Sequence, residues 1–345
     1  MMATDREAAQ PRNVNRSPEY APLLQVEGLR KHFTVTRGFP KRETVTVRAV
    51  DGVSFSIAPG EALGLVGESG CGKSTAARAL LRLIEPDAGR VLYRGQDVTA
   101  ARGGDLRALR QRMQIVFQDP YSSLDPRQTI GSALIEPLRL HGIARGPAAR
   151  DRAAALLEEV GLPPSALDRF PHEFSGGQRQ RIGIARALTV EPELIVADEP
   201  VSALDVSVQA QVLLLLRDLQ RRRGLSFLFV SHDLSVVRWF CDRVAVMYLG
   251  RIIEEGPVDR VLRDPLHPYA RVLRDASPVP DPALRGALPR LTGELPSAAS
   301  PPRGCHFHPR CPRALPVCAT AYPGWTATGQ GGVACHLHGP GTPAA

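Results

Sequence analysis

The sequence predicts an α/β fold with a largely parallel sheet, a helical insertion and a small irregular C-terminal extension. Short apolar segments that read as strands alternate with segments of helical spacing. A stretch rich in helix formers separates two of these strands, and proline recurs from residue 257 onward. Because parallel strands need crossover connections, which are usually helices, this alternation is typical of an α/β domain.

The composition is that of an ordinary globular protein. The 345 residues include 43% hydrophobic and 23% charged residues, with a net charge of +8. These values exclude a wholly disordered chain, a collagen and a coiled-coil rod. The scattered arginines are interpreted as a solvated surface, with no nucleic-acid partner expected. No stretch reaches the ~18 apolar residues of a membrane helix, and residues 1–22, a polar tail, lack the apolar core of a signal peptide.

The first part of the chain predicts strands that lead into a glycine-rich loop. Residues 23–29 are a candidate strand, and the basic residues 37–48 are a candidate loop. Apolar and polar residues alternate over 53–57, and residues 62–66 are interpreted as a short buried strand. The glycine-rich residues 67–72 follow, and residues 74–84 have helical spacing of Ala and Leu.

The middle of the chain predicts the helical insertion, which we place at about residues 105–186. A strand-like segment interrupts it at residues 114–117. Residues 194–197 and 227–230 are again short apolar strands, and residues 206–222 between them predict a long amphipathic helix.

A phosphate-binding loop is the first motif that carries chemistry. Gly67-Glu-Ser-Gly-Cys-Gly-Lys-Ser74 fits G-x-x-x-x-G-K-[ST] between a strand and a helix, which is the context this motif requires. Glycines let the backbone turn its N–H groups onto phosphate oxygens, and the helix N-terminus favours negative charge. Lys73 is expected to reach the β- and γ-phosphates and Ser74 to bind Mg²⁺. The motif alone predicts a nucleoside triphosphate, without separating a GTPase, a small-molecule kinase or a motor.

Polar side chains follow two further strands. Asp198 and Glu199 come after the apolar segment that starts at Leu194, and His232 closes the strand that starts at Phe227. Ligands of open α/β sheets bind at the carboxyl ends of the strands, where these residues are expected to converge with the loop. We expect Asp198 to hold Mg²⁺ through water, and Glu199, pointing the opposite way, to polarise the attacking water as a general base.

The segment Phe174-Ser-Gly-Gly-Gln-Arg-Gln-Arg181, just ahead of a helix at residues 183–188, resembles the signature of ATP-binding cassette (ABC) ATPases. This resemblance covers residues 23–256 and implies a P-loop NTPase (RecA-like) core with an inserted helical subdomain and an antiparallel β edge. It also implies that two ATPase domains pack head to tail, each signature covering the partner's ATP. Gln118 matches the Q-loop, residues 202–205 the D-loop and His232 the switch histidine.

The resemblance implies a full set of site residues. Catalytic roles fall to Glu199, His232 and Gln118, and Mg²⁺ contacts to Ser74, Gln118 and Asp198. Phe33 is placed to stack on adenine. The residues implied to bind ATP are Phe33, Gly67, Ser69, Gly70, Gly72, Lys73, Ser74, Thr75, Asp198, Ser175, Gly177, Gln178 and Asp205.

The last part of the chain carries a second resemblance, to a smaller group within this family. Asp264-Pro-Leu-His-Pro-Tyr-Ala270 and Gly304-Cys-His-Phe-His-Pro-Arg-Cys311 look like the extension of oligopeptide/dipeptide importer ATPases, here residues 257–345. The resemblance implies a second homologous ATPase chain, two membrane permease subunits and, indirectly, an extracytoplasmic peptide-binding protein. The expected location is the cytoplasmic face of the inner membrane, peripherally bound. An importer of nickel or another small solute, and a soluble ABC ATPase without transport, are the alternatives.

Four of the six cysteines crowd the C-terminal segment: Cys305, Cys311, Cys318 and Cys335. In a reducing compartment such a group is more often a metal site than a disulfide framework. Four thiolates suit a [4Fe–4S] cluster or tetrahedral Zn²⁺, and unligated thiols are the third interpretation. Cys71 is interpreted as a small residue that fits the phosphate loop, and Cys241 as a core residue.

Overall fold

The computed structural model describes residues 21–37, 43–119, 121, 123–276 and 296–339. Its larger sheet runs β11-β12-β10-β9-β3-β8-β7-β6, and the five strands from β9 to β6 are parallel. The strands of the whole sheet are β3 (Ala62–Val66), β6 (Met113–Val116), β7 (Leu194–Asp198), β8 (Ser226–Ser231), β9 (Arg243–Tyr248), β10 (Arg251–Pro257), β11 (Thr326–Ala327) and β12 (Gly332–Val333). The predicted α/β class with a largely parallel sheet is therefore confirmed.

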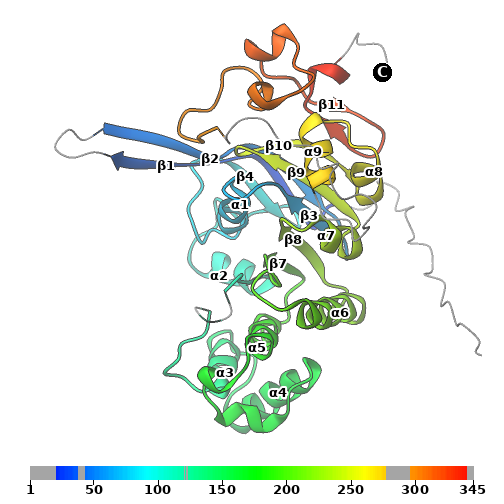
Figure 1. The fold of residues 1–345 in the computed structure, drawn as a ribbon. Coiled ribbons are helices and arrows are strands. Elements are labelled where there is room, and N and C mark those ends of the chain that lie inside the picture. The colour runs from blue at the N-terminus through cyan, green and yellow to red at the C-terminus, as the bar shows by residue number, and fades with distance from the viewer. Residues whose placement is uncertain (1–20, 38–42, 120, 122, 277–295, 340–345) are drawn as a thin grey trace, which may run out of the picture.

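A smaller antiparallel sheet, in the order β2-β1-β4-β5, forms the expected β edge. Its strands are β1 (Leu24–Arg37), β2 (Glu43–Ile57), β4 (Ala88–Tyr93) and β5 (Gln96–Asp97). The loop expected at residues 37–48 is wrong, because β1 and β2 pair out to Arg37 and Glu43 in a hairpin that projects from the body (Figure 1). Alternating Thr and Val over residues 44–47 favour a strand there, despite the basic flanks.

Helices cover the larger sheet and make up the lower lobe in Figure 1. The helix after the glycine-rich loop ends at Leu80, four residues earlier than expected, and the signature helix begins at Gly176, seven residues earlier than expected. The helix expected at 206–222 is confirmed as α6. The helices are α1 (Lys73–Leu80), α2 (Gly103–Arg112), α3 (Ile130–Leu140), α4 (Gly146–Glu159), α5 (Gly176–Leu188), α6 (Val206–Arg223), α7 (Leu234–Phe240), α8 (Val258–Arg263) and α9 (Pro268–Ala276).

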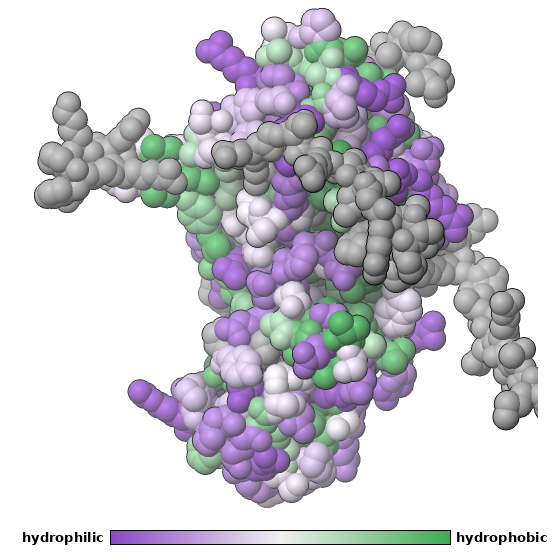
Figure 2. Space-filling view, viewed as in Figure 1, coloured by the Kyte–Doolittle hydropathy of each residue, from purple (hydrophilic) through white to green (hydrophobic). Residues whose placement is uncertain are grey.

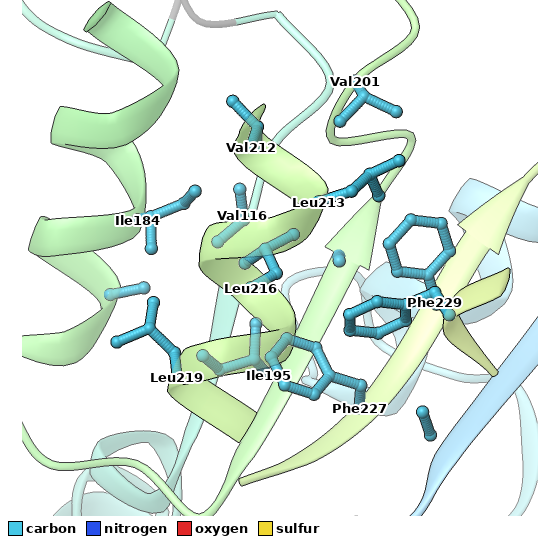
Figure 3. Close-up of a cluster of buried hydrophobic side chains, with 14 of the residues drawn as sticks. Val116, Ile184, Ile195, Val201, Val212, Leu213, Leu216, Leu219, Phe227 and Phe229 are labelled. Carbon is cyan, nitrogen blue, oxygen red and sulfur yellow. The ribbon is translucent and has the colours of Figure 1, made fainter. Parts of the chain in front are cut away.

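Both faces of the parallel sheet are buried. Along β8, Phe227 and Phe229 pack into one apolar cluster, while Leu228 and Val230, which alternate with them, pack into another. This alternation follows from the two-residue period of a strand. Figure 3 shows part of the first cluster, in which α5 and α6 lie against β7 and β8, with the labelled residues Val116, Ile184, Ile195, Val201, Val212, Leu213, Leu216, Leu219, Phe227 and Phe229. Cys241 is fully buried, as expected.

The C-terminal segment joins the sheet. β12 pairs with β10 through Glu254–Val333 and Glu255–Gly332, so residues far beyond 257 extend the core sheet. The expected irregular segment does contain short 3-10 helices, such as those at Pro316–Ala319 and His336–His338. The tail expected at residues 1–22 lies almost wholly outside the described residues, as do the prolines at 278, 280, 282 and 289.

Hydrophilic residues predominate on the face in Figure 2, and a hydrophobic patch lies over α6. Val206 and Leu214 of α6 are 82% and 59% exposed. Among the described residues, no helix combines the length and the apolarity needed to cross a bilayer. The exposed side of α6 begins directly after the D-loop expected at residues 202–205.

Candidate ATP-hydrolysis site

The phosphate loop joins the buried strand β3 to α1, as predicted. Two of its glycines, Gly67 and Gly72, are required by close backbone approach. A Cβ on Gly67 would lie 2.2 Å from the carbonyl oxygen of Met247, and one on Gly72 would lie 1.9 Å from that of Ala49. Gly72 also has a φ of 107°, which disfavours L side chains. Ser69 and Gly70 are exposed on the loop, and Thr75 lies in the first turn of α1.

The Lys73 side chain is buried and folds back onto its own loop. Its Nζ donates to the carbonyl oxygens of Gly67, at 2.8 Å, and of Glu68, at 3.0 Å. The ammonium group is therefore held inside the loop, where the phosphate chain of a nucleotide is expected.

The loop and the end of β7 are joined by a hydrogen bond. Ser74 Oγ donates to Asp198 Oδ1 at 2.7 Å. Asp198 is 1% exposed, and burial raises the pKa of its carboxyl above the ordinary value, against the hydrogen bond from Ser74 and the charge of Arg78. Its second oxygen, Oδ2, is buried with no hydrogen-bond partner. A hydroxyl and a half-satisfied carboxylate are the oxygen ligands that Mg²⁺ prefers, so this pair fits the expected ion.

Arg78 was not among the predicted site residues. Its Nη2 lies 3.8 Å from Asp198 Oδ2, where it offsets part of the carboxylate's charge. Arg78 follows Ser74 by four residues on α1, so both side chains project from the same face of the helix. That spacing was the available signal.

Glu199 is the centre of a second group. Its Oε2 accepts a hydrogen bond from Gln118 Nε2 at 3.0 Å, and it lies 3.3 Å from His232 Nδ1. The structure therefore brings together the three residues to which catalytic roles were assigned. The direction of the Glu199 side chain was expected to follow from strand alternation. It does not, because β7 ends at Asp198 and Glu199 has a φ of 48°. Left-handed non-glycine residues are uncommon and cluster at functional sites.

The signature residues form a helix N-terminus. Ser175 is the N-cap of α5, and its Oγ accepts from the Gln178 N–H while Gln178 Oε1 accepts from the Ser175 N–H. A Cβ on Gly177 would lie 2.3 Å from Val208 Cγ1, so this position needs glycine where α5 packs on α6. Asp205 is the N-cap residue of α6. In Figure 1, α5 lies in the lower lobe, well away from α1 and its phosphate loop.

Phe33 lies in the hairpin, opposite Val47 of β2, with Lys31 Nζ 5.5 Å from the centre of its ring.

Tyr121, beyond the Q-loop, is 61% exposed, and the guanidinium of Arg179 lies 4.0 Å from its ring centre. The neighbouring Pro120 and Ser122 lie outside the described residues.

The four tail cysteines are free thiols. Burial raises the pKa of Cys305 to about 11, and it raises the pKa of Cys311 and Cys335 in the same direction. Within the described part of the chain, no group of three or more His, Cys, Asp or Glu side chains could hold a metal ion. The expected metal site is therefore not formed by these side chains as they lie.

Comparison with known proteins decides the family. A family model described as ABC transporter matches residues 50–202, and one described as oligopeptide/dipeptide transporter, C-terminal region, matches residues 253–318. A putative peptide import ATP-binding protein of Brucella ovis is 54% identical over 302 residues, covering 88% of this chain and 93% of the relative. The chain belongs to the ABC transporter ATPases, in their peptide-import group.

Other relatives and solved structures agree with this placement. The oligopeptide transport ATP-binding protein AppF of Bacillus subtilis is 51% identical, covering 92% of this chain and 97% of its own length. A dimeric ATP-binding cassette solved with ADP and Pi is 28% identical at a TM-score of 0.59, covering 68% of this chain and 98% of that one. CbiO1 of Clostridium perfringens, part of an ABC transporter complex, is 27% identical at a TM-score of 0.58. The match covers 70% of this chain and 91% of CbiO1. This ABC ATPase binds ATP with Mg²⁺ and couples hydrolysis to transport.

Proposed function

We propose that this ABC ATPase powers the import of di- and oligopeptides through the site that Ser74, Asp198 and Glu199 organise. The observation that supports this proposal best is that the phosphate loop is hydrogen-bonded to the end of β7, beside the catalytic group around Glu199. Ser74 donates to Asp198, and Gln118 and His232 converge on the next residue, Glu199. Ion ligands and a general base thus lie side by side, as phosphoryl transfer to water requires.

In this proposal the loop holds the nucleotide. Backbone N–H groups from Ser69 to Thr75 and the N-terminus of α1 bind the phosphates, Lys73 turns from its two carbonyls to the β- and γ-phosphates, and Phe33 stacks on adenine. Ser74, Asp198 and Gln118 hold Mg²⁺, which neutralises the charge that develops on the phosphate oxygens.

Glu199 takes a proton from the attacking water in this scheme. Its carboxylate is already aimed by the Gln118 amide, and His232, 58% exposed on its side chain, stands beside it to contact the γ-phosphate. Both neighbours restrain the carboxylate before water arrives, which reduces the reorganisation needed in the reaction.

The signature acts on a second chain in this proposal. Ser175, Gly177 and Gln178, with Asp205 at the D-loop, cover ATP bound to the partner's phosphate loop. Two features support a dimer: α5 lies away from this chain's own α1, and α6 exposes Val206 beside the D-loop. The dimeric cassette among the similar structures supports the same arrangement. We propose that the partner is a second homologous ATPase.

A groove of about 440 Å³ beside the Q-loop is proposed as the contact with a membrane permease. Its lining includes Ser123, Asp125, Gln128, Glu136 and Arg186. Its lining includes Gln114 and Ser123, on either side of Gln118 in the sequence, so a permease segment seated in it would sense the position of the Q-loop. Two permease subunits would hold the ATPase pair at the cytoplasmic face of the inner membrane, with a peptide-binding protein on the other side.

A metal in the tail is a separate proposal: Cys305, Cys311, Cys318 and Cys335 bind a [4Fe–4S] cluster or Zn²⁺ after rearrangement. Its support is the four-thiol donor set. The thiols also lie near one another, since the charges of neighbouring cysteines add to burial in raising the pKa of Cys305, Cys311 and Cys335. We route no catalytic step through it. Iron, sulfide and zinc analysis of the anaerobically purified chain tests it, and about four irons, one zinc or neither metal per chain decide between the interpretations.

The transport role is tested by affinity purification of the tagged chain from native membranes. We expect two polytopic subunits, a sister ATPase and a peptide-binding protein in the purified material. Recovery of ribosomes or DNA-repair factors without membrane subunits would overturn the transport role and leave the ATPase site standing. A nickel-binding protein in place of the peptide-binding protein would change the substrate.

A further inference from the structure

Glu68, the first residue after Gly67 in the phosphate loop, uses all three of its polar groups. Its carbonyl oxygen serves the loop itself, accepting from the Cys71 N–H at 3.2 Å and from Lys73 Nζ at 3.0 Å. The position of this peptide therefore helps to set both the curl of the loop and the location of the lysine.

The other two groups of Glu68 are held from outside the loop. Its N–H donates to Tyr269 Oη at 2.9 Å, and its carboxylate accepts two hydrogen bonds from Arg310, at 3.1 and 3.2 Å. Tyr269 and Arg310 lie 201 and 242 residues further along the chain, in the C-terminal segment. A forked arginine–carboxylate pair fixes orientation as well as distance.

The two outside residues sit in a packed aromatic cluster. Tyr269 is fully buried, with its ring centre 4.5 Å from that of Tyr248 and 5.4 Å from that of Phe307. Arg310 has 6% of its side chain exposed and also donates to Tyr248 Oη at 3.4 Å. Side chains held this tightly transmit a displacement of the C-terminal segment instead of absorbing it.

The charge of Glu68 gives the contact a second consequence. A carboxylate on a loop that binds phosphates repels them unless a cation neutralises it. Lys73 is committed to the loop carbonyls here and is expected to move to the phosphates, so Arg310 is the cation that stays with Glu68 when nucleotide binds.

We propose that Arg310 and Tyr269 are positioning residues of the phosphate loop, so that the ATP affinity of this loop depends on the docked C-terminal segment. Neither residue is proposed to touch the nucleotide or the attacking water. They act through Glu68, whose peptide they hold from the N–H side and whose carboxylate they turn away from the phosphates.

The test compares two arginines of the same segment. Arg310→Met removes the contact, and Arg303→Met is the matched control, because Arg303 is exposed. Binding of Mg²⁺ with the slowly hydrolysed analogue ATPγS to the purified full chain is measured by calorimetry, with the melting temperature alongside. We expect Arg310→Met to weaken binding about tenfold (the loss of ~1.4 kcal/mol) and Arg303→Met to leave it unchanged.

Three further variants keep the proposal falsifiable if Arg310→Met folds poorly. Tyr269→Phe keeps the ring in its cluster and removes only Oη, and we expect several-fold weaker binding at an unchanged melting temperature. Arg310→Lys should restore binding in part, since a single ammonium group replaces the two guanidinium N–H donors. Glu68→Gln/Arg310→Met leaves no unpaired carboxylate but still frees the loop, so binding should stay weak.

Wild-type affinity in folded Arg310→Met and Tyr269→Phe would overturn the proposal. Full recovery in the double variant would also overturn it, because Arg310 would then only neutralise charge. The inference rests on ATP binding at this loop, which Lys73→Ala tests independently. If Lys73→Ala binds as wild type, the site itself is misassigned; if Lys73→Ala is weak while Arg310→Met is normal, only the positioning role fails.

Discussion

Ser74 and Asp198, 124 residues apart, share a 2.7 Å hydrogen bond that ties the phosphate loop to the end of β7. The bond links the two parts of the molecule that must hold one Mg²⁺ together. Because Asp198 Oδ2 is buried and has no hydrogen-bond partner, the carboxylate keeps one oxygen ready for an ion.

Removing the hydroxyl tests this link. We expect Ser74→Ala to weaken Mg²⁺-dependent ATP binding about tenfold, equivalent to one lost ligand or hydrogen bond of ~1.4 kcal/mol. Binding measured without Mg²⁺ should change much less. Equal losses with and without the ion would show that Ser74 serves the loop's structure and not the metal.

Asp198→Asn should stabilise the nucleotide-free chain at neutral pH. Burial raises the carboxyl pKa above its ordinary value of 3.8, so the ionised form costs stability at pH 7, where the unfolded chain is also ionised. The cost falls as pH drops through the raised pKa and vanishes below the unfolded pKa. We expect a melting temperature a few degrees higher at pH 7, with the gain shrinking toward pH 4. A variant less stable than wild type at pH 7 would contradict this.

Glu199→Gln should separate binding from hydrolysis. Removing a general base costs about 10²–10⁴ in rate, while the amide keeps the size of the side chain. We expect steady-state ATP hydrolysis by the assembled complex to fall by that factor, with ATP bound as tightly as before. A turnover rate near that of the wild type would show that Glu199 is not the general base.

Two glycines of the phosphate loop should differ in their tolerance of a methyl group. Gly70 and Gly72 both have positive φ, at 78° and 107°, but a Cβ on Gly70 meets nothing within 4 Å. We expect Gly70→Ala to cost about 1 kcal/mol and Gly72→Ala about 3 kcal/mol or more, because Gly72 faces the Ala49 carbonyl. Thermal melting of the two variants checks the order, and equal losses would argue against the close approach.

Local patterns predicted much of the site. The strand–loop–helix around Lys73 follows from a buried apolar strand, glycines and helix formers in sequence, and strand ends converge for a topological reason. Ser74, Asp198, Glu199 and His232 were named on that basis, whereas Gln118 was named from the family resemblance. The prediction of a loop at residues 37–48 was wrong, because it gave the basic residues more weight than the alternating Thr and Val at 44–47.

Other features depend on tertiary contacts that no local pattern carries. The φ of Glu199 is set where β7 ends and the chain turns, and Glu199 N–H donates to the Val230 carbonyl of β8. The pairing of Glu68 with Arg310 joins positions 242 residues apart. Neither residue shows a periodicity or spacing that relates it to the other.

Peptide transport by the reconstituted complex tests the central claim most directly. The complex purified through this chain is placed in proteoliposomes with its binding protein, and uptake of a labelled peptide is followed with ATP on the side of the ATPase. We expect ATP-dependent accumulation with the wild-type chain and none with Glu199→Gln. Equal accumulation with both chains, or ATP hydrolysis without any peptide uptake by the wild type, would contradict the account.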